Sequence, residues 1–321
     1  MTLPQLRSFA TVARLGSVKA AARTLGVSEP AVSEAVASLR RELGDELYVR
    51  RGGGIALTPG GTRLAAAAAE ILGLADDARR AVREARGESA LLRVAATSEV
   101  HEHVAPALLD AFTRRSPHTE VAVQMEPGEV FARLLTDRLA DVTLGPRPPG
   151  DAAGLESVPF LRYRLVVVAA PGHPLAGRRA IPAEALGREH WLVGPSGATP
   201  GTPAGDLLAR RRLGGVEVRA FPSHAAAAAA AASGRGVLPA IAHTVLDELR
   251  RRALVTLDVE GTPVDGLLYA TLLAPARRPA AAWAFRRFVA TPEATQAMLA
   301  RPGGVPAARF RPPVYVTLWS G

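Results

Sequence analysis

Residues 16–33 read GSVKAAARTLGVSEPAVS, and this stretch predicts two helices joined by a tight turn. Ser17 can cap the first helix, and Gly26 can end it because glycine tolerates the left-handed backbone of a C-cap. After one intervening residue Ser28 can cap the second helix, with Pro30 in the first turn, where its missing N–H costs nothing. Two helices joined in this way form a helix-turn-helix.

The neighbouring residues extend this motif to a winged helix-turn-helix. Apolar residues at spacings of three and four predict a helix before Ser17 and a buried face on the helix after Ser28. Residues 47–51 and 55–57 read as short strands around Gly52–Gly54, and Arg50 and Arg51 lie at the tip of this wing. A three-helix core with a solvated hairpin is the alternative interpretation of the same pattern.

A long helix should follow, with Thr58 as its cap and Pro59 at its first position. Over 59–86 it would be about 42 Å long. Such a rod is too long to be buried against the first 58 residues, so a second subunit is the expected partner. Spacings of three and four predict the dimerising face, which contains Leu64, Ile71, Leu74, Ala78 and Val82.

The composition excludes several classes of protein. The 321 residues contain 39 Lys+Arg against 30 Asp+Glu, an excess that is spread along the chain and by itself identifies no nucleic-acid partner. The lack of Cys excludes disulfides, thiolate metal sites and cysteine nucleophiles. No apolar run reaches the roughly 18–20 residues of a membrane span, and we find no export signal. We therefore expect a soluble, cytoplasmic protein without a membrane partner.

Four stretches resemble the N-terminal signature of LysR-type transcriptional regulators: LPQLRSF (3–9), GSVKAAARTLGVSEPAVS (16–33), LRRELGDEL (39–47) and LTPGG (57–61). Two weaker stretches, LADVTL (139–144) and GRGVLP (234–239), also look like the family's pattern. The resemblance implies a homodimer or homotetramer that binds double-stranded DNA. It also implies a dimerising linker helix and a two-lobed α/β effector domain like periplasmic binding proteins. The effector would be a small molecule, such as a small anion or carboxylate.

The rest of the sequence agrees with this fold class, in which an all-α winged helix-turn-helix precedes an α/β domain. Short apolar strands alternate with helices that begin near Ser98 and Glu129, which predicts a parallel sheet. The expected domains are 1–58 for DNA binding, 59–89 for the linker and dimerisation helix, 90–300 for the effector domain and 301–321 for a C-terminal extension. Lobe I would contain 90–161 and 267–300, and lobe II 162–266.

The DNA-facing residues depart from the family's pattern at two positions. Glu29 stands where a Gln is usual and Glu34 where a basic residue is frequent, and a carboxylate is unfavourable beside phosphate. Because Glu can accept a hydrogen bond from cytosine N4 in the major groove, we expect a half-site that contains C. The other predicted DNA-binding residues, most of them phosphate contacts, are Lys19, Arg23, Ser28, Pro30, Ser33, Arg50 and Arg51.

The expected effector site lies where strands end and helices begin, because helix N-termini offer unpaired N–H groups to an anion. Arg147 could supply the positive charge that attracts such an anion. Each Ser or Thr in this set could instead be only a helix cap, since a cap and a ligand donor have the same sequence signature. The predicted effector residues are Thr97, Ser98, Arg147, Ser196, Gly197, Thr199, Thr202, Ser223 and His224.

Other functions have weaker signals. Residues 194–198 (GPSGA) lack the final Gly of a nucleophile elbow, so a hydrolase that uses Ser196 is disfavoured, and we expect no catalytic residues. His101 and His103 point to different sides of a helix, so we expect no metal and no other cofactor. A sensing protein with a disabled DNA-binding domain is the main alternative. The extension at 301–321 could pair as a strand or be disordered.

Overall fold

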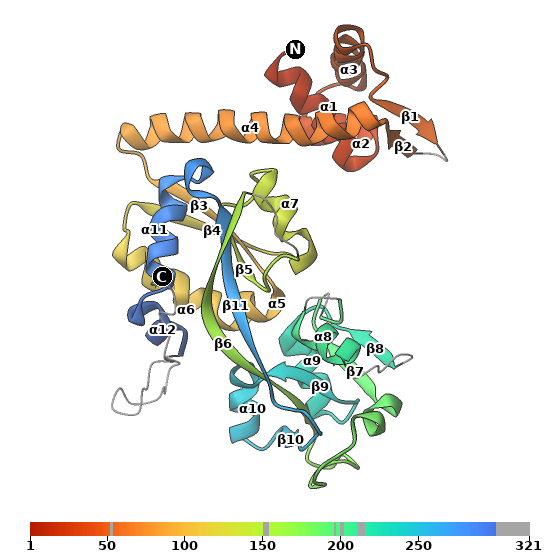
Figure 1. Ribbon diagram of the computed structural model, residues 1–321, viewed down its shortest axis with the longest axis vertical. Helices are drawn as coiled ribbons and strands as arrows, with labels where there is room; N and C mark the ends of the chain where they lie inside the picture. The colour runs from red at the N-terminus through yellow and green to blue at the C-terminus, as the bar shows by residue number, and fades with distance from the viewer. Residues whose placement is uncertain (52–53, 150–153, 196, 200–201, 211–215, 300–321) are drawn as a thin grey trace, which may run out of the picture. The chain divides into compact units, whose positions relative to one another are not determined.

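A computed structural model describes residues 1–51, 54–149, 154–195, 197–199, 202–210 and 216–299 (Figure 1). Gly52, Gly53, Ser196 and the 301–321 extension therefore lie outside the described residues. The chain divides into two compact units, of which the first holds Met1–Glu88 and the second most of the remaining chain. No helix in the described part of the chain is long and apolar enough to cross a membrane.

The first unit is a winged helix-turn-helix followed by a long helix (Figure 1). The predicted caps are confirmed: Ser17 Oγ accepts a hydrogen bond from Ala20 N at 3.2 Å, and Ser28 Oγ accepts one from Ala31 N at 3.3 Å. Gly26 has a left-handed φ of 67°, as its C-cap position requires. The elements are α1 (Leu3–Leu15), α2 (Val18–Leu25), α3 (Glu29–Leu43), β1 (Tyr48–Arg51), β2 (Gly54–Leu57) and α4 (Pro59–Ala85).

The start of α4 lies against the loop that follows α3. Thr58 Oγ1 accepts a hydrogen bond from Gly61 N at 2.8 Å and donates one to Asp45 Oδ1 at 2.7 Å. Asp45 Oδ1 also accepts from Leu47 N at 2.6 Å, and these two bonds, that of Thr58 first, lower the pKa of Asp45. A Cβ on Gly61 would lie 1.8 Å from the carbonyl oxygen of Leu47. The LTPGG stretch is therefore fixed by close backbone contact.

The second unit is built on one mixed sheet of seven strands. The sheet order is β10-β6-β11-β5-β3-β4, and β9 also pairs with β6. The strands are β3 (Ala90–Ala96), β4 (Thr119–Met125), β5 (Val142–Gly145), β6 (Leu155–Ala169), β9 (Leu238–Ile241), β10 (Val255–Leu257) and β11 (Val264–Leu273), and a separate parallel pair is formed by β7 (His190–Val193) and β8 (Glu217–Ala220).

The parallel arrangement expected from the alternation of strands and helices is confirmed for β3, β4 and β5, but the sheet as a whole is mixed. β3 is parallel to both β4 and β5, as the alternation with helices predicts. However, β11 is antiparallel to β5 and β6, and β6 is antiparallel to β9 and β10. The cause is the return of the chain through β11, which enters the sheet between β5 and β6 in the opposite direction.

Helices cover the strands in two lobes. Lobe I contains α5 (Ser98–His103), α6 (Ala105–Arg115), η1 (Gly128–Val130), α7 (Phe131–Thr136), η4 (Pro275–Arg277), α11 (Ala280–Val289) and α12 (Pro292–Leu299). Lobe II contains η2 (Ala183–Arg188), α8 (Pro203–Arg210), α9 (His224–Ala232), η3 (Ala242–Val245) and α10 (Leu246–Arg250). Each lobe has its own core: Phe112 packs edge-on against Phe285 at 5.1 Å in lobe I, and Trp191 is fully buried in lobe II.

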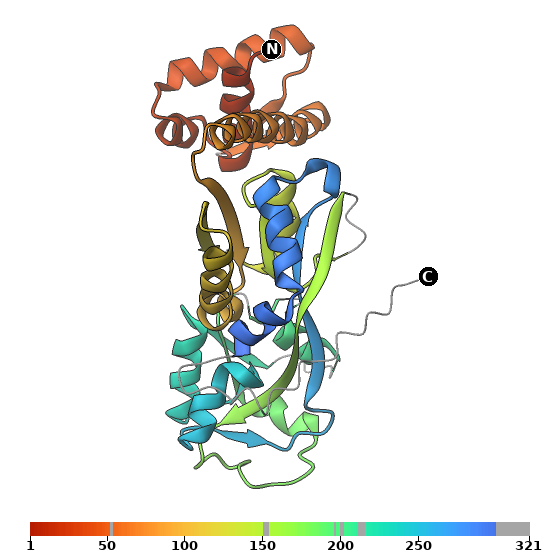
Figure 2. The same cartoon turned by 90° about the vertical axis from the view of Figure 1, so that its left-hand side faces the viewer.

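β6 and β11 belong to both lobes. They pair from Leu155 with Leu273 to Leu165 with Val264 and lie side by side along the unit (Figure 2). The lobe boundaries expected from the sequence, at 161/162 and 266/267, fall within this paired stretch, where Arg162 lies opposite Leu267. The lobes are therefore joined by two hydrogen-bonded strands rather than by a loose linker.

Two weaker sequence stretches have structural roles. In LADVTL, Asp141 accepts from Arg93 N at 2.9 Å and from Arg93 Nη2 at 2.7 Å, which ties β5 to β3. In GRGVLP, a Cβ on Gly236 would lie 2.2 Å from the carbonyl oxygen of His190, so this position, two residues before β9, has to be glycine. Both stretches position strands.

We expect Gly61→Ala to destabilise the first unit by about 1–3 kcal/mol, because the new methyl group would overlap the Leu47 carbonyl. Urea unfolding monitored by circular dichroism measures this change. Gly172→Ala is the matched control, because a Cβ there meets nothing within 4 Å. Equal stability of the two variants would show that the loop relaxes around the added atom.

Candidate functional site

The α3 helix presents the predicted DNA-facing residues to solvent. Val32, Val36 and Leu39 are buried, so the opposite face of the helix is exposed. The predicted residues on α2 and on strand β1 of the wing are exposed as well. The exposed predicted DNA-binding residues are Lys19, Arg23, Ser28, Glu29, Pro30, Ser33, Glu34, Arg50 and Arg51.

One of the two unusual carboxylates on α3 has a partner on its own helix. Arg41 Nη2 donates to Glu34 Oε1 at 2.8 Å, and both side chains are mostly exposed. The pair offsets part of the negative charge of Glu34. Glu29 lies in the first turn of α3, where the helix dipole favours a negative charge.

Arg40 fixes the wing against α3 and was missed by the sequence analysis. Its guanidinium lies 4.3 Å from the centre of the Tyr48 ring, and Nη2 donates to the Tyr48 carbonyl oxygen at 3.0 Å. Nη1 lies 3.2 Å from Glu46 Oε2. These contacts hold the base of β1, whose far end carries Arg50 and Arg51. An Arg eight residues before a Tyr or Phe of the wing is too common a pattern to have indicated this role.

The predicted dimerisation residues of α4 are not equivalent. Leu64 packs against the core of its own unit, close to Leu6 and Phe9. Further along the helix, Leu74 is 58% exposed and Val82 61% exposed, and Ile71 and Ala78 are also exposed. The second half of α4 therefore presents an apolar stripe that the described residues leave exposed.

In the effector domain, a carboxylate that the sequence analysis missed joins two of the predicted residues, Ser98 and His224. Glu102 Oε1 accepts hydrogen bonds from Ser98 Oγ and from the backbone N of His224, both at 2.8 Å. Glu102 Oε2 accepts one from Ala225 N at 2.9 Å. Ser98 and Glu102 belong to α5 of lobe I, whereas His224 and Ala225 begin α9 of lobe II. One side chain thus bridges the lobes.

The environment of Glu102 favours its ionised form. Burial raises the pKa of this carboxyl, but the amide hydrogen bonds from Ala225 and His224 and the bond from Ser98 outweigh that effect and hold the pKa below its ordinary value. Glu99 lies one turn earlier, and there burial raises the pKa and outweighs the hydrogen bonds from its own backbone amide and from Thr97. Adjacent carboxyl groups of α5 therefore differ in charge preference because of the donors around them.

His224 begins α9 as a buried, neutral side chain. Its Nε2 lies 3.0 Å from Thr244 Oγ1, and the Thr244 hydroxyl donates to the Ile241 carbonyl oxygen, so we assign the imidazole proton to Nε2. Burial, followed by the nearby charge of His103, lowers the pKa of His224 to about 4. A cavity of about 210 Å³ adjoins these two rings and is lined largely by the alanines of α9.

Gly194, at the end of β7, lies against the same junction between the lobes. A Cβ at this position would lie 3.1 Å from Ser98 Oγ and 3.3 Å from His224 N. These distances are shorter than ordinary van der Waals contact. Glycine therefore lets β7, α5 and α9 converge around Glu102.

The other predicted effector residues have different surroundings. Thr202 Oγ1 lies 2.6 and 2.7 Å from the carbonyl oxygens of Gly197 and Thr199, which share its one hydroxyl proton, and it accepts from Gly205 N at 3.1 Å, so it closes a turn before α8. Thr97 is buried at the start of α5, and Arg147 is exposed after β5. The structure brings Ser98, Ser223 and His224 together and assigns Thr202 to capping.

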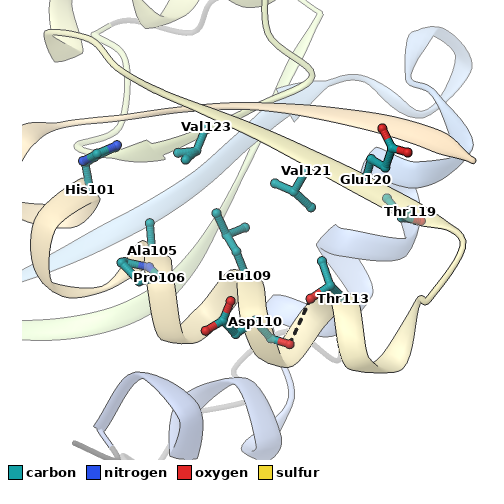
Figure 3. A pocket seen from close by; sticks show the side chains of 10 residues that line it. All are labelled: His101, Ala105, Pro106, Leu109, Asp110, Thr113, Thr119, Glu120, Val121 and Val123. Atoms are coloured by element: carbon teal, nitrogen blue, oxygen red, sulfur yellow. Dashed lines mark hydrogen bonds between the residues drawn. The ribbon is translucent and has the colours of Figure 1, made fainter.

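A groove of about 550 Å³ lies elsewhere on lobe I, between α6 and the edge strand β4. Val121 and Val123 of β4 and Leu109 of α6 extend into it, and Asp110 and Glu120 lie at its margins (Figure 3). None of the predicted effector residues lines this groove. It is an apolar surface beside β4, which is an edge strand of the sheet as far as the chain is described, and sequence periodicity alone did not indicate it.

Comparison with known proteins identifies the family. The family model for bacterial regulatory helix-turn-helix proteins of the lysR family matches residues 3–62, and the LysR substrate binding domain matches residues 85–292. The chain belongs to the LysR family of transcriptional regulators. The family resemblance, the DNA-binding function and the two-lobed fold expected from the sequence are thus confirmed.

Similar proteins cover most of this LysR-type regulator. An HTH-type transcriptional regulator of Mycobacterium tuberculosis is 39% identical, with 100% of both chains covered. The RuBisCO operon transcriptional regulator of Allochromatium vinosum is 32% identical over 90% of this chain and 95% of its own. Full-length OxyR of Pseudomonas aeruginosa has the same fold, with a TM-score of 0.63 and 21% identity over 90% of this chain and 94% of that chain.

A solved regulatory domain with a ligand is also similar. The structure of the Synechocystis CcmR regulatory domain in complex with 2-PG is 27% identical, covers 63% of this chain and 96% of that one, and has a TM-score of 0.53. Similar proteins are named as transcriptional regulators. Among the described residues of this LysR-type regulator, no group of three or more His, Asp or Glu is arranged to hold a metal ion.

We expect Glu102→Gln to lower the free energy of unfolding of the effector domain at neutral pH. Because the folded-state pKa of Glu102 lies below the unfolded value, ionised Glu102 stabilises the fold above its ordinary pKa, and this contribution is lost as the pH falls through the lowered pKa. The difference from wild type should shrink as the pH falls below the ordinary carboxyl pKa and through the lowered pKa of Glu102. Urea titrations across this pH range check it, with exposed Glu260→Gln as the control. A pH-independent difference would contradict the assignment.

Proposed function

We propose that this LysR-type regulator binds its operator as a homo-oligomer, and that a small molecule bound between the two lobes changes that binding. The observation that carries the DNA-binding part is the exposed α3 face beside a wing with two exposed arginines. We further propose the domain boundaries 1–58, 59–89, 90–300 and 301–321, with lobe II at 162–266. A regulator of this kind acts on DNA in the cytoplasm and needs neither a catalytic residue nor a cofactor.

In the proposed complex α3 enters the major groove and the wing contacts the backbone. Lys19, Arg23, Ser28, Ser33, Arg50 and Arg51 bind phosphate, and Pro30 allows close approach of the helix. Glu29 accepts a hydrogen bond from cytosine N4. Glu34 could do the same only by giving up part of its pairing with Arg41, so Glu29 is the stronger candidate for base recognition. This exposed face and the family membership favour DNA binding over the interpretation as a sensor without DNA function.

The α4 stripe supports self-association. Ile71, Leu74, Ala78 and Val82 are exposed, and burying them against the same residues of a second copy would remove this apolar surface from water. Two copies held in this way can place two α3 helices on half-sites about 34–36 Å apart. A dimer is the smallest assembly that satisfies this geometry, and a tetramer would join two of them.

The junction of the lobes supports effector binding. Thr97, Ser98, Arg147, Gly197, Thr199, Thr202, Ser223 and His224 remain the proposed effector residues, together with Ser196. The similar CcmR regulatory domain was solved with a small molecule, 2-PG. A small anion or carboxylate is the proposed chemical class, although the amides of His224 and Ala225 already bind the carboxylate of Glu102.

Binding titrations at several salt concentrations on the DNA upstream of its own coding region test the function. We expect a steep negative dependence on salt, because phosphate contacts release counterions. Replacing both Arg50 and Arg51 with Ala should weaken binding to all sequences and reduce the log–log slope by about 1 for each lost contact. Glu29→Gln should instead change the preference between half-site variants by about 1–3 kcal/mol.

Arg83→Ala on α4 is the control for the arginine variants, since it removes one exposed positive charge outside the wing. Binding that does not depend on salt, or an absence of binding at low ionic strength, would overturn the DNA-binding proposal. An unchanged base preference in Glu29→Gln would remove only the role of that carboxylate.

We expect Leu74→Glu to weaken self-association at least tenfold, because it places a carboxylate in the apolar stripe of α4. Sedimentation velocity over a range of protein concentrations measures the change. Arg83→Glu is the control, because nine residues correspond to about half a turn and the carboxylate then lies on the opposite face. Equal dissociation of both variants, or a wild-type protein that is monomeric at all concentrations, would contradict the proposed interface.

A further inference from the structure

Glu102 makes the hydrogen bonds that connect α5 of lobe I with the start of α9 in lobe II. Its two carboxylate oxygens accept from Ser98 Oγ, His224 N and Ala225 N at 2.8–2.9 Å. The donors from lobe II are backbone amides, so the contact requires the N-terminus of α9 and does not depend on a particular side chain of that helix. A charge-assisted hydrogen bond of this kind is roughly twice as strong as a neutral one.

The start of α9 needs this carboxylate because its local cap is incomplete. Ser223 Oγ accepts only the bond from Ala226 N, at 3.0 Å. The amides of His224 and Ala225 are the next unpaired donors of the helix, and each is taken by Glu102. If the lobes moved apart, these amides and the Glu102 carboxylate would have to bind water or another partner. The hydrogen bonds are therefore sensitive to the separation of the lobes.

The surroundings of Glu102 are packed for this arrangement. The His103 ring, next in sequence, meets the His224 ring edge-on with 5.4 Å between centres. Gly194 leaves space for Ser98 Oγ and His224 N that a larger residue would fill. His224 is neutral and is held by Thr244, so it does not compete with the amides for the carboxylate. These contacts make the junction specific to one placement of α5 against α9.

We propose that Glu102 is an internal latch that holds the lobes together, and that release of its hydrogen bonds to α9 is the step through which an effector acts. This inference rests on the proposed function, in which a small molecule between the lobes changes DNA binding. The latched and released arrangements are two states, and an effector shifts them only if it binds one more tightly than the other. The hydrogen bonds of Glu102 stabilise the latched state. They therefore set how much more tightly an effector must bind the released state in order to shift the equilibrium.

Amide hydrogen exchange on the full-length protein tests the latch directly. We expect Glu102→Ala to raise the exchange rates of His224 and Ala225 at least tenfold, with little change in the second half of α9. Glu102→Gln keeps the shape but loses the charge, so it should give an intermediate increase. Glu260→Ala, in an exposed turn of lobe II, removes the same charge elsewhere and should leave the rates unchanged.

Acetate provides a second measurement on the same variant. It supplies the carboxylate that Glu102→Ala lacks and should restore part of the protection of His224 and Ala225, whereas chloride at equal ionic strength should not. Unchanged exchange in Glu102→Ala would overturn the latch. Loss of protection along the whole effector domain would also overturn it, since the residue would then support the fold rather than one junction.

The regulatory part is tested by nuclease protection of the upstream DNA without any small molecule. We expect Glu102→Ala to change the length of protected DNA relative to wild type, and Glu260→Ala to leave it unchanged. A wild-type pattern in Glu102→Ala, combined with faster exchange at α9, would overturn the regulatory role of the latch while DNA binding stands. If wild type fails to protect DNA, the proposed function fails, and the exchange result still decides whether the latch exists.

Discussion

Every helix begins with backbone amides that have no partner inside the helix, and this chain meets that requirement in two ways. Ser17, Ser28 and Thr58 each accept from the amide three residues further along the chain, which fixes where the helices of the first unit begin. At α9 the local cap is insufficient, and a carboxylate from a distant part of the sequence completes it. The local caps each fix the start of one helix, whereas the carboxylate of Glu102 caps a helix of the other lobe and so fixes the position of the two lobes relative to each other.

This difference explains how much could be predicted from the sequence. The helix-turn-helix, the wing and the linker helix follow from caps, glycines and apolar spacings that lie within a few residues of one another. Ser223 was predicted at the start of α9 for the same reason. Glu102 lies 122 residues from His224, and no local pattern links the two. The available signal was indirect: a carboxylate one helical turn after Ser98, opposite a helix expected to bind an anion.

The sheet shows the same limit at a larger scale. Alternating strands and helices gave the parallel relation of β3 to its neighbours, because such connections are local. The direction of β11 depends on where the chain re-enters lobe I after about a hundred residues of lobe II, and apolar content does not encode that. Among the predicted effector residues, Thr202 is a capping residue, as the alternative interpretation of such Ser and Thr residues allowed.

The pairing of β6 with β11 limits what any rearrangement of the effector domain can be. Because both strands continue through the two lobes, the lobes cannot separate without breaking a ladder of backbone hydrogen bonds. Motion is confined to flexing and twisting of the two paired strands. The ladder of hydrogen bonds is interrupted at the register irregularity between Leu268 and Tyr269, so the strands bend most easily there. Small angular changes there are amplified with distance along each lobe. The two lobes can therefore rotate slightly relative to each other as rigid bodies, but they cannot open as widely as lobes joined by a flexible linker.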